Sequence, residues 1–274
     1  MKLRTISVLG CGWLGLPLAE ALARTGHTVR GSTTSAEKLE RLEAAGIEPH
    51  RIVLGDEVEG DDPEAFFEAD VLVFCVPPSG STASYPAVAS AVRRAAERAG
   101  TGWVLMTSST SVYPDLDGVV TESDAGAHEG VPLRRNGEDV LVAERVFYGA
   151  TAFDTTILRL AGLYGYGRHP ARYFAGKRDL AGGEAPVNLV HRDDVIGAVM
   201  AVLEHEARGA TFNVCADHHP TRNRLYPATA ERLGLEPPTF NGAEADGYKI
   251  VSSQRLRDRL DFRFAYPDPM TPAP

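Results

Sequence analysis

Three glycines near the N-terminus constrain the fold of this chain more than any other feature. Gly10, Gly12 and Gly15 stand in GxGxxG spacing within VLGCGWLG, directly after the apolar run at 6–10. At this spacing the first glycine permits a tight turn, the second lets the backbone approach a pyrophosphate, and the third lets a helix pack against the preceding strand. The N–H groups at the start of that helix then face the anion. The pattern predicts a βαβ unit that binds a dinucleotide, rather than glycines that serve only a turn.

Apolar runs typical of strands alternate with helical patterns through the first two thirds of the chain. The strands are predicted at 6–10, 27–32, 50–56, 70–78, 103–109 and 155–165. The helices are predicted at 14–26, through Leu39 and Leu42 to Gly46, at 88–99 and at 140–147. Such alternation requires crossover connections and a parallel sheet covered on both faces. We therefore expect an α/β fold, a Rossmann-type doubly wound parallel sheet with a small C-terminal substrate lobe.

The strand and helix pattern weakens after Gly162, where Gly and Pro cluster. We assign 1–160 to the dinucleotide-binding core, completed by 187–215, and 161–186 and 216–274 to the smaller lobe and tail. The Pro-rich end, PDPMTPAP, is predicted to be poorly ordered. The charged run around Arg255 is predicted to be the solvated face of a helix.

Bulk properties exclude several classes of partner. A net charge of −9 disfavours nucleic acid and anionic membranes, since both require a surplus of Lys and Arg. No apolar run approaches the roughly 18 residues that span a bilayer. The three cysteines show no CxxC spacing, which fits a reducing cytoplasm. Cys215, His218 and His219 lack the second ligand pair of a closed zinc site, so we expect no metal site.

The end of the second strand bears on the choice of dinucleotide. An enzyme that uses NAD places Asp or Glu there to hold the ribose 2′-hydroxyl, but here no acid precedes Glu37. The stretch instead offers hydroxyls and cations: Arg30, Ser32, Thr33, Thr34 and Lys38. Thr34 to Glu37 also has capping-box spacing, so a helix N-terminus would favour an anion at this point. We favour NADP, with NAD as the alternative; hydroxyls that only cap the helix are the other interpretation.

Three further motifs carry a family resemblance: MTSSTSVYP at 106–114, RLAGLYGYGRHP at 159–170 and VNLVHRDDV at 187–195. With them the chain resembles the extended short-chain dehydrogenase/reductase superfamily, in particular its atypical epimerase/dehydratase-like members, over residues 5–265. It departs from the GxxGxxG that extended members usually carry. The resemblance implies an oxidoreductase or epimerase acting on a small hydroxy or keto compound, sugar-like ones included. A homodimer is an option, because relatives often dimerise through the helices beside the active site.

The expected cofactor site gathers the glycine loop and the ends of the neighbouring strands. Its residues are Gly10, Cys11, Gly12, Trp13, Leu14, Gly15, Arg30, Ser32, Thr33, Thr34, Lys38, Asp56, Val76, Pro77 and Leu160.

The catalytic residues that the resemblance implies are only partly present. Ser109 matches the hydroxyl that polarises the substrate oxygen, and Tyr113 is the landmark tyrosine of its motif. The family's Tyr-x-x-x-Lys pair precedes a recurrent Glu; if Glu144 is that Glu, the pair falls on Asn136 and Val140. The Lys normally lowers the Tyr pKa from about 10 toward neutrality, so that a phenolate can take the alcohol proton. Neither Asn nor Val can do this, and the usual dyad is absent. Asn136 is instead a good N-cap, with Asp139 as its partner.

Other titratable groups are candidates to replace the dyad. Tyr113, Tyr164 and His191 are the candidate catalytic residues that the resemblance places near the cleft together with Ser109. Two of them have a structural alternative: Tyr113 as a packing residue, and His191 as a hydrogen-bonded structural histidine. Arg168 could hold an anionic substrate group or be a solvated loop charge.

Two functions therefore remain open. The first is an NADP-dependent enzyme in which Ser109 holds the substrate and a substitute Tyr, His191 or water manages the proton. The second is a catalytically silent NADP(H) binder, a redox sensor or regulator, which would account for Asn136 and Val140. A small-molecule substrate is the expected partner of the enzyme.

Overall fold

The computed structural model describes residues 2–78, 83–127, 130–133 and 136–273. The chain divides into two compact units, each built from three segments. The first comprises Met1–Val112, Arg134–Arg159 and Val199–Thr211. The second comprises Tyr113–Leu133, Leu160–Ala198 and Phe212–Pro274. None of the described helices is both long and apolar enough to cross a bilayer.

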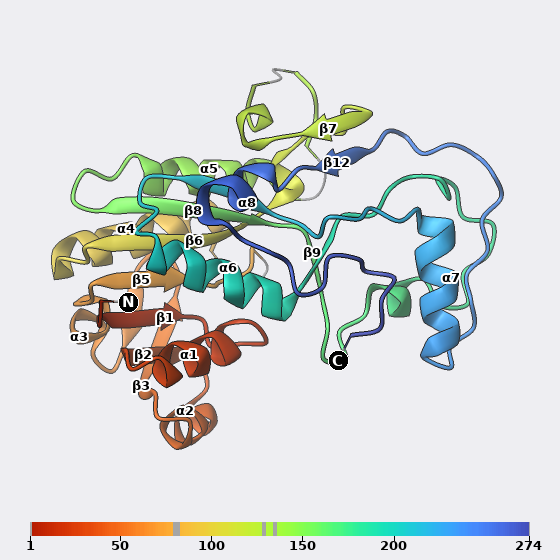
Figure 1. The fold of residues 1–274 in the computed structure, drawn as a ribbon. Coiled ribbons are helices and arrows are strands. Elements are labelled where there is room, and N and C mark those ends of the chain that lie inside the picture. The colour runs from red at the N-terminus through yellow and green to blue at the C-terminus, as the bar shows by residue number, and fades with distance from the viewer. Residues whose placement is uncertain (1, 79–82, 128–129, 134–135, 274) are drawn as a thin grey trace. The chain divides into compact units, whose positions relative to one another are not determined.

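The first unit is organised by one large sheet (Figure 1). Its strand order is β11-β8-β6-β5-β1-β2-β3-β4, and β8 and β11 run from the first unit into the second. The strands are β1 (Thr5–Leu9), β2 (Thr28–Thr33), β3 (Glu48–Leu54), β4 (Val58–Gly60), β5 (Val71–Phe74), β6 (Trp103–Ser109), β8 (Asp154–Leu160) and β11 (Thr211–Val214). Strand β1 pairs in parallel with both β2 and β5, and β3 pairs with β4 in an antiparallel hairpin.

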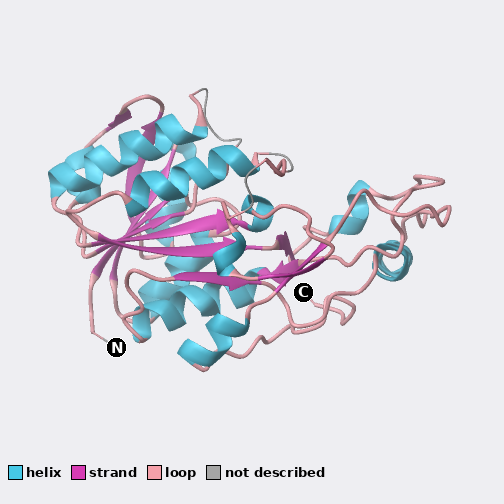
Figure 2. Ribbon diagram, turned by 90° about the horizontal axis from the view of Figure 1, so that it is seen from above, coloured by secondary structure: helices cyan, strands magenta, loops and turns pink. Residues whose placement is uncertain are grey.

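Helices lie on both faces of this sheet (Figure 2). They are α1 (Gly15–Arg24), α2 (Leu39–Ala44), α3 (Pro63–Phe67), α4 (Tyr85–Ala99), α5 (Gly137–Tyr148) and α6 (Arg192–Glu204). Helix α4 buries Val88, Ala91, Val92 and Ala95, which stand at the spacing of one helix face. The predicted doubly wound α/β fold is confirmed.

The strand order changes direction at β1, which fixes where a ligand can bind. From β1 the chain builds outward to β2 and β3, and then returns to the other side of β1 with β5 and β6. In open α/β sheets, ligands bind at the carboxyl ends of the strands where the order reverses. The glycine loop leaves β1 at this point, and Val76 and Pro77 follow β5 beside it.

The predicted elements of the first unit agree with the structure, with two exceptions. The run at 155–165 divides into β8 and a separate strand, β9 (Gly162–Tyr164). The capping box at 34–37 does not form. The N-cap is Ser35, which opens a short 3-10 turn, η1 (Ala36–Lys38), without a side-chain cap bond among the described residues. The reason is local: Thr33 Oγ1 accepts a hydrogen bond from the Ser35 backbone N–H at 3.2 Å and bends the chain first.

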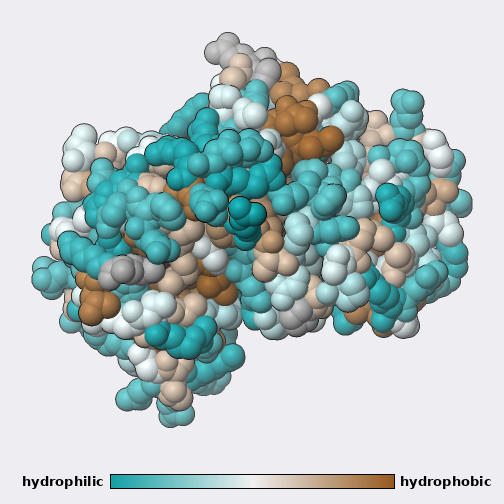
Figure 3. Space-filling model, viewed as in Figure 1, coloured by the Kyte–Doolittle hydropathy of each residue, from teal (hydrophilic) through white to brown (hydrophobic). Residues whose placement is uncertain are grey.

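In its described residues, the second unit contains two small parallel sheets, two helices of its own and the first part of α6. Strand β7 (Gly118–Val120) pairs with β12 (Lys249–Val251), and β9 pairs with β10 (Leu189–His191). The helices are α7 (Arg222–Arg232) and α8 (Gln254–Leu260), the latter confirming the helix predicted around Arg255. In Figure 3, hydrophobic side chains gather over the position of β7, where Val119 is 63% exposed.

The prediction of a poorly ordered tail is wrong. Met270 and Ala273 pack against a buried cluster that contains Leu225, Tyr226 and Ala230 of α7. The guanidinium of Arg232 also donates to the Met270 carbonyl at 2.7 Å. Apolar contacts and this hydrogen bond fix a segment that its proline content alone suggested was loose.

Candidate cofactor and active site

The three glycines of the loop have distinct steric surroundings. Gly10 has φ +97°, and a Cβ there would lie 3.2 Å from the Cys75 carbonyl oxygen. A Cβ on Gly15 would lie 2.2 Å from the Gly10 carbonyl oxygen, so helix α1 can approach β1 this closely only with glycine. A Cβ on Gly12 would meet no described atom within 4 Å. The backbone at Gly12 is therefore open on the side where a pyrophosphate would approach, while Gly10 and Gly15 hold the turn.

The loop is fastened to β2 and presents a helix start. Gly10 N–H donates to the Ser32 hydroxyl at 2.9 Å, and Cys11 N–H donates to the Ser32 carbonyl at 2.8 Å. The N-cap of α1 is Leu14, which provides no side-chain acceptor, and the first turn contains no acid. The N-terminus of α1 thus keeps the positive end of its dipole available to an anion.

Two of the predicted contacts to the cofactor are engaged within the protein. Ser32 is 2% exposed and accepts the hydrogen bond from Gly10, so its hydroxyl shapes the loop. Arg30 donates to the carbonyl oxygens of Ala65 at 2.5 Å and Glu68 at 2.6 Å. Its guanidinium closes the C-terminal end of α3.

The remaining polar candidates at the end of β2 face solvent. Thr34 and Lys38 are exposed, and Thr33 is half-buried with its hydroxyl accepting from Ser35. Asp56 is also exposed and lies in the β3–β4 hairpin, where its carbonyl accepts from Arg94. The solvent-facing groups at and after the strand end are therefore the Thr34 hydroxyl, the Glu37 carboxylate and the Lys38 ammonium.

The residues after β5 are held close to the glycine loop. Tyr85 donates its hydroxyl hydrogen to the Val76 carbonyl at 3.0 Å, and Pro77 is exposed. Burial raises the pKa values of the Cys11 and Cys75 thiols to about 12, so both are neutral at physiological pH. Trp13 is half-buried on the loop, and Leu160 is 6% exposed at the end of β8.

Ser109 ends strand β6, and its hydroxyl hydrogen has no acceptor within the described part of the chain. Its Oγ accepts the backbone N–H of Ser111 at 3.1 Å. An oxygen that accepts in this way still carries a hydrogen to donate. Ser109 can therefore donate a hydrogen bond to a substrate oxygen without giving up its local contact.

Helix α5, where the resemblance would place the acid/base pair, has a valine at position 140. Asn136 is the N-cap of α5, as predicted, although its side chain makes no cap bond with the described residues. Val140 is 1% exposed and packs in the core. One turn further, Glu144 is also 1% exposed. The inward face of α5 thus offers one titratable group, a buried carboxylate.

That carboxylate belongs to a network that the sequence did not reveal. Arg159 Nη2 donates to Glu144 Oε2 at 2.7 Å, and Arg159 Nε donates to Oε1 at 3.0 Å. Ser108 Oγ donates to the same Oε1 at 2.5 Å. The signal that could have predicted it is Arg159 itself, a cation in the otherwise apolar strand TTILRL, because a buried charge requires a partner.

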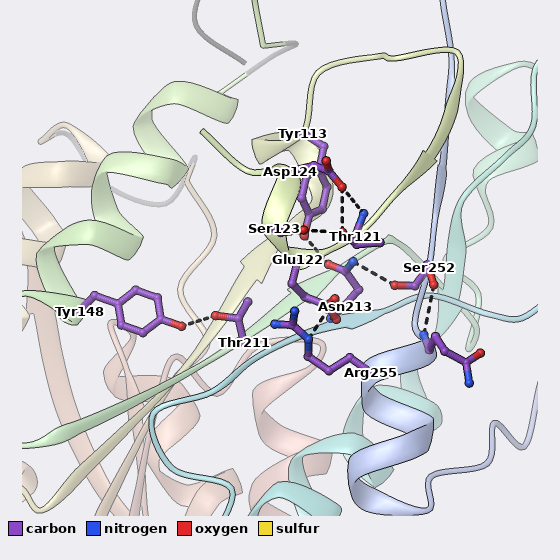
Figure 4. A network of polar contacts seen from close by, with 11 residues as sticks. Tyr113, Thr121, Glu122, Ser123, Asp124, Tyr148, Thr211, Asn213, Ser252 and Arg255 are labelled. Atoms are coloured by element: carbon purple, nitrogen blue, oxygen red, sulfur yellow. Dashed lines mark hydrogen bonds and ion pairs between the residues drawn. The ribbon is translucent and has the colours of Figure 1, made fainter. Parts of the chain in front are cut away.

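Tyr113 is fixed in a polar network of the second unit (Figure 4). It is fully buried, and its hydroxyl donates to Asn213 Oδ1 at 2.6 Å. Asn213 Nδ2 in turn donates to the Ser252 carbonyl at 3.0 Å, and the Asn213 backbone N–H donates to Glu122 Oε1 at 2.8 Å. These contacts support the packing interpretation of Tyr113.

His191 and Tyr164 lie in an aromatic cluster of the second unit. The His191 ring is fully buried, with its centroid 5.1 Å from that of Tyr164 and 3.9 Å from that of Tyr266. Its Nδ1 accepts the Asp193 backbone N–H at 3.3 Å. A Cβ on Gly165 would lie 2.3 Å from His191 Nε2, so the loop fits the ring only with glycine there. The structural interpretation of His191 is supported by this packing.

Two cavities lie within the second unit. The larger has a volume of about 630 Å³, and its charged lining side chains are the carboxylates Asp117, Glu184 and Glu244. The smaller, about 230 Å³, is lined by Tyr164, Arg168, His169 and Arg232 among others. Within the described residues, no three His, Cys, Asp or Glu side chains lie close enough to hold a metal ion.

Known proteins resemble this chain over nearly its whole length. A family model described as NAD(P)H-binding matches residues 10–206. Protein YeeZ from Escherichia coli K12 is 37% identical over 274 residues, 98% of each chain. A functionally unknown conserved protein from Silicibacter pomeroyi matches with TM-score 0.75 at 25% identity, covering 97% of this chain and 95% of its own. UDP-N-acetylglucosamine 4-epimerase from Bacillus cereus matches with TM-score 0.75 at 19% identity, covering 96% and 94%, a likeness of fold alone.

Proposed function

Because the chain belongs to the NAD(P)H-binding family, within the epimerase/dehydratase-like short-chain dehydrogenase/reductase superfamily, we propose that it is an NADP-dependent oxidoreductase or epimerase-type enzyme. Its substrate is a small hydroxy or keto compound, sugar-like ones included. The observation that carries the proposal is the glycine loop, closed at Gly10 and Gly15 and open at Gly12. When bound, the cofactor supplies or accepts the hydride.

The phosphates of the cofactor are held by the loop and by the start of α1. Leu14 leaves the helix start without a competing side-chain acceptor. The 2′-phosphate is held at the end of β2 by Thr34 and Lys38, since both face solvent there. Ser32 and Arg30 support this binding indirectly, by shaping the loop and the neighbouring turn.

Ser109 orients the substrate oxygen and the proton comes from water. A hydroxyl donor stabilises developing charge on an oxygen but is too weak an acid to release its own proton at neutral pH. Tyr113 is bound to Asn213 and His191 is enclosed by aromatic rings, so neither is free to exchange a proton. Burial raises the pKa of Tyr164, and the negative charge of Asp194 raises it further. Tyr164 is therefore a weaker acid than an ordinary tyrosine.

A second function is supported by one observation. Val140 occupies the lysine position and is 1% exposed, so α5 is packed as a structural helix. A protein that binds NADP(H) and signals its redox state, without turnover, would have the same loop and the same helix.

Cofactor titration with matched glycine variants tests the proposal. We expect Gly12→Ala to fold as the wild type does and to lose at least tenfold in NADPH affinity, because the new methyl meets only the ligand. Gly118→Ala is the control, since its nearest described contact is 3.8 Å away in the second unit. Fluorescence of bound NADPH and NADH is the measurement. Equal NADPH affinity of Gly12→Ala and wild type would contradict the proposed site.

Turnover separates the two functions. A panel of carbonyl and hydroxy compounds is followed by the absorbance of the reduced cofactor, with wild type and Ser109→Ala. We expect turnover that falls about 100-fold in Ser109→Ala, since one oxyanion donor contributes roughly 10²–10³ in rate. Tight NADPH binding without turnover of any compound favours the sensor. A preference for NADH over NADPH would reject the assignment of NADP. So would an equal loss of affinity for both cofactors in Lys38→Met.

A further inference from the structure

The smaller cavity of the second unit has a composition suited to an anion. It lies where the loop 164–169 meets the end of α7 and the segment 271–273. None of the described residues that line it is Asp or Glu, whereas Arg168, Arg232 and His169 are among them. Its volume of about 230 Å³ is below the roughly 300–1,000 Å³ of pockets that hold drug-sized ligands. The cavity therefore suits a small, negatively charged group.

A buried hydroxyl lines the same cavity without a hydrogen-bond partner. Tyr164 is 2% exposed, and its hydroxyl oxygen has no partner among the described residues. Buried polar groups are almost always paired, so an unpaired one indicates a missing acceptor or donor. Because burial raises the pKa of Tyr164, the hydroxyl keeps its hydrogen. It can therefore donate that hydrogen to an acceptor in the cavity.

The positive charge of the cavity lining depends on the protonation state of His169. The pKa of His169 is lowered to about 4, mainly by burial and in addition by the charges of Arg232 and Arg172. The ring is therefore neutral at physiological pH, and the positive charge of the lining comes from the guanidiniums. An anion in the cavity would lie next to the positive charges of Arg168 and Arg232.

Nearby carboxylates are already satisfied by the backbone. Asp194 accepts the backbone N–H groups of Ala265 at 2.6 Å and Tyr266 at 3.1 Å. Asp268 accepts that of Met270 at 2.9 Å. These acids raise the pKa of Tyr164 but do not line the cavity. They do not supply the acceptor that its hydroxyl lacks among the described residues.

We propose that this cavity is a binding site for a small oxyanion, a carboxylate or a phosphate group. The Tyr164 hydroxyl donates a hydrogen bond to the anion, and Arg168 and Arg232 provide the countercharge. The His169 ring, beside them, forms part of the wall. The site is contained in the second unit, and the inference holds whether or not the proposed function is correct.

Calorimetric titration of the full chain with inorganic phosphate and with acetate tests this proposal. Each titration is compared with a titration of sodium chloride at equal ionic strength, because any added salt also screens the charges of the protein. We expect binding of at least one of the two oxyanions, and affinity lowered at least tenfold in Tyr164→Phe and in Arg168→Met. The two probes distinguish a phosphate-bearing ligand from a carboxylate.

The controls are a tyrosine and an arginine away from the cavity. Tyr173→Phe removes a hydroxyl from a side chain that is 68% exposed, and Arg224→Met removes an exposed charge from α7. Both should bind as wild type does. Tyr164→Phe removes only an unpaired hydroxyl, so it should fold normally. Wild-type protein that binds neither oxyanion beyond chloride overturns the proposal, and so does unchanged binding by Tyr164→Phe, which would place the anion elsewhere, such as the glycine loop.

Discussion

Removing the cation of the buried network should destabilise the protein far more than removing a surface charge. In Arg159→Met the stem of the side chain is kept, while Glu144 stays in the core with 2% side-chain exposure and no counterion. Leaving one partner of a buried ion pair uncompensated costs about 3–5 kcal/mol. Ser108 would still donate to the carboxylate at 2.5 Å, which favours the lower part of that range.

Urea unfolding followed by circular dichroism measures this loss, with two variants beside it. Arg94→Met removes a surface pair with Glu57, in which the side chains are 44% and 65% exposed, and should lose about 0–1 kcal/mol. A double variant, Arg159→Met with Glu144→Leu, should recover much of the lost stability, because an apolar pair needs no countercharge.

Two results would refute the reasoning. One is a free energy of unfolding for Arg159→Met within about 1 kcal/mol of that of Arg94→Met, which would mean that water reaches the carboxylate. The other is a double variant no more stable than the single one, which would mean that the loss came from packing rather than from the unpaired charge.

Three further predictions concern the loop, a helix cap and pH. Gly15→Ala should lose about 1–3 kcal/mol of stability together with NADPH affinity, since its methyl would meet the Gly10 carbonyl oxygen at 2.2 Å. Thermal unfolding measures the stability and fluorescence titration measures the affinity. A variant as stable as the wild type would show that the loop relaxes. Asp62→Ala should lose about 1 kcal/mol in urea unfolding, because Asp62 Oδ1 caps α3 by accepting the Ala65 N–H at 3.1 Å. Burial lowers the pKa of His169 from 6.5 to about 4, so its contribution is complete above pH 6.5 and falls as pH drops toward 4. His169→Gln should reduce the fall in stability across that range; an identical pH profile would contradict the shift.

Local patterns explain why much of the first unit could be predicted. The glycine loop depends on residues within one turn, and the α4 pattern repeats at the helical period, so both can be recognised without knowledge of distant contacts. Strand β4 has only three residues, Val58–Gly60, and becomes a strand only by pairing with β3. A short polar segment of this kind cannot show the alternation of apolar and polar residues by which a strand is predicted.

The parts of the site that escaped prediction depend on long-range contacts. Arg30 and Ser32, predicted to contact the cofactor, have partners that are remote in sequence: the carbonyls at the end of α3 and the loop after β1. Tyr113 and His191 each had two interpretations from sequence, and only their burial and neighbours favour the structural one. The apolar contacts of Met270 likewise depend on α7, more than thirty residues away by the numbering of the chain.

The packing of α5 leaves little room for a lysine at position 140. A lysine placed at 140 would have to push a long amine into a space that a valine fills to 1% exposure. Such an amine would be desolvated, with the guanidinium of Arg159 bound to the acid one turn along the same helix. Introducing a tyrosine at 136 and a lysine at 140 would therefore place a neutral amine in a strained core, so a working proton relay at these positions would also require smaller side chains around it.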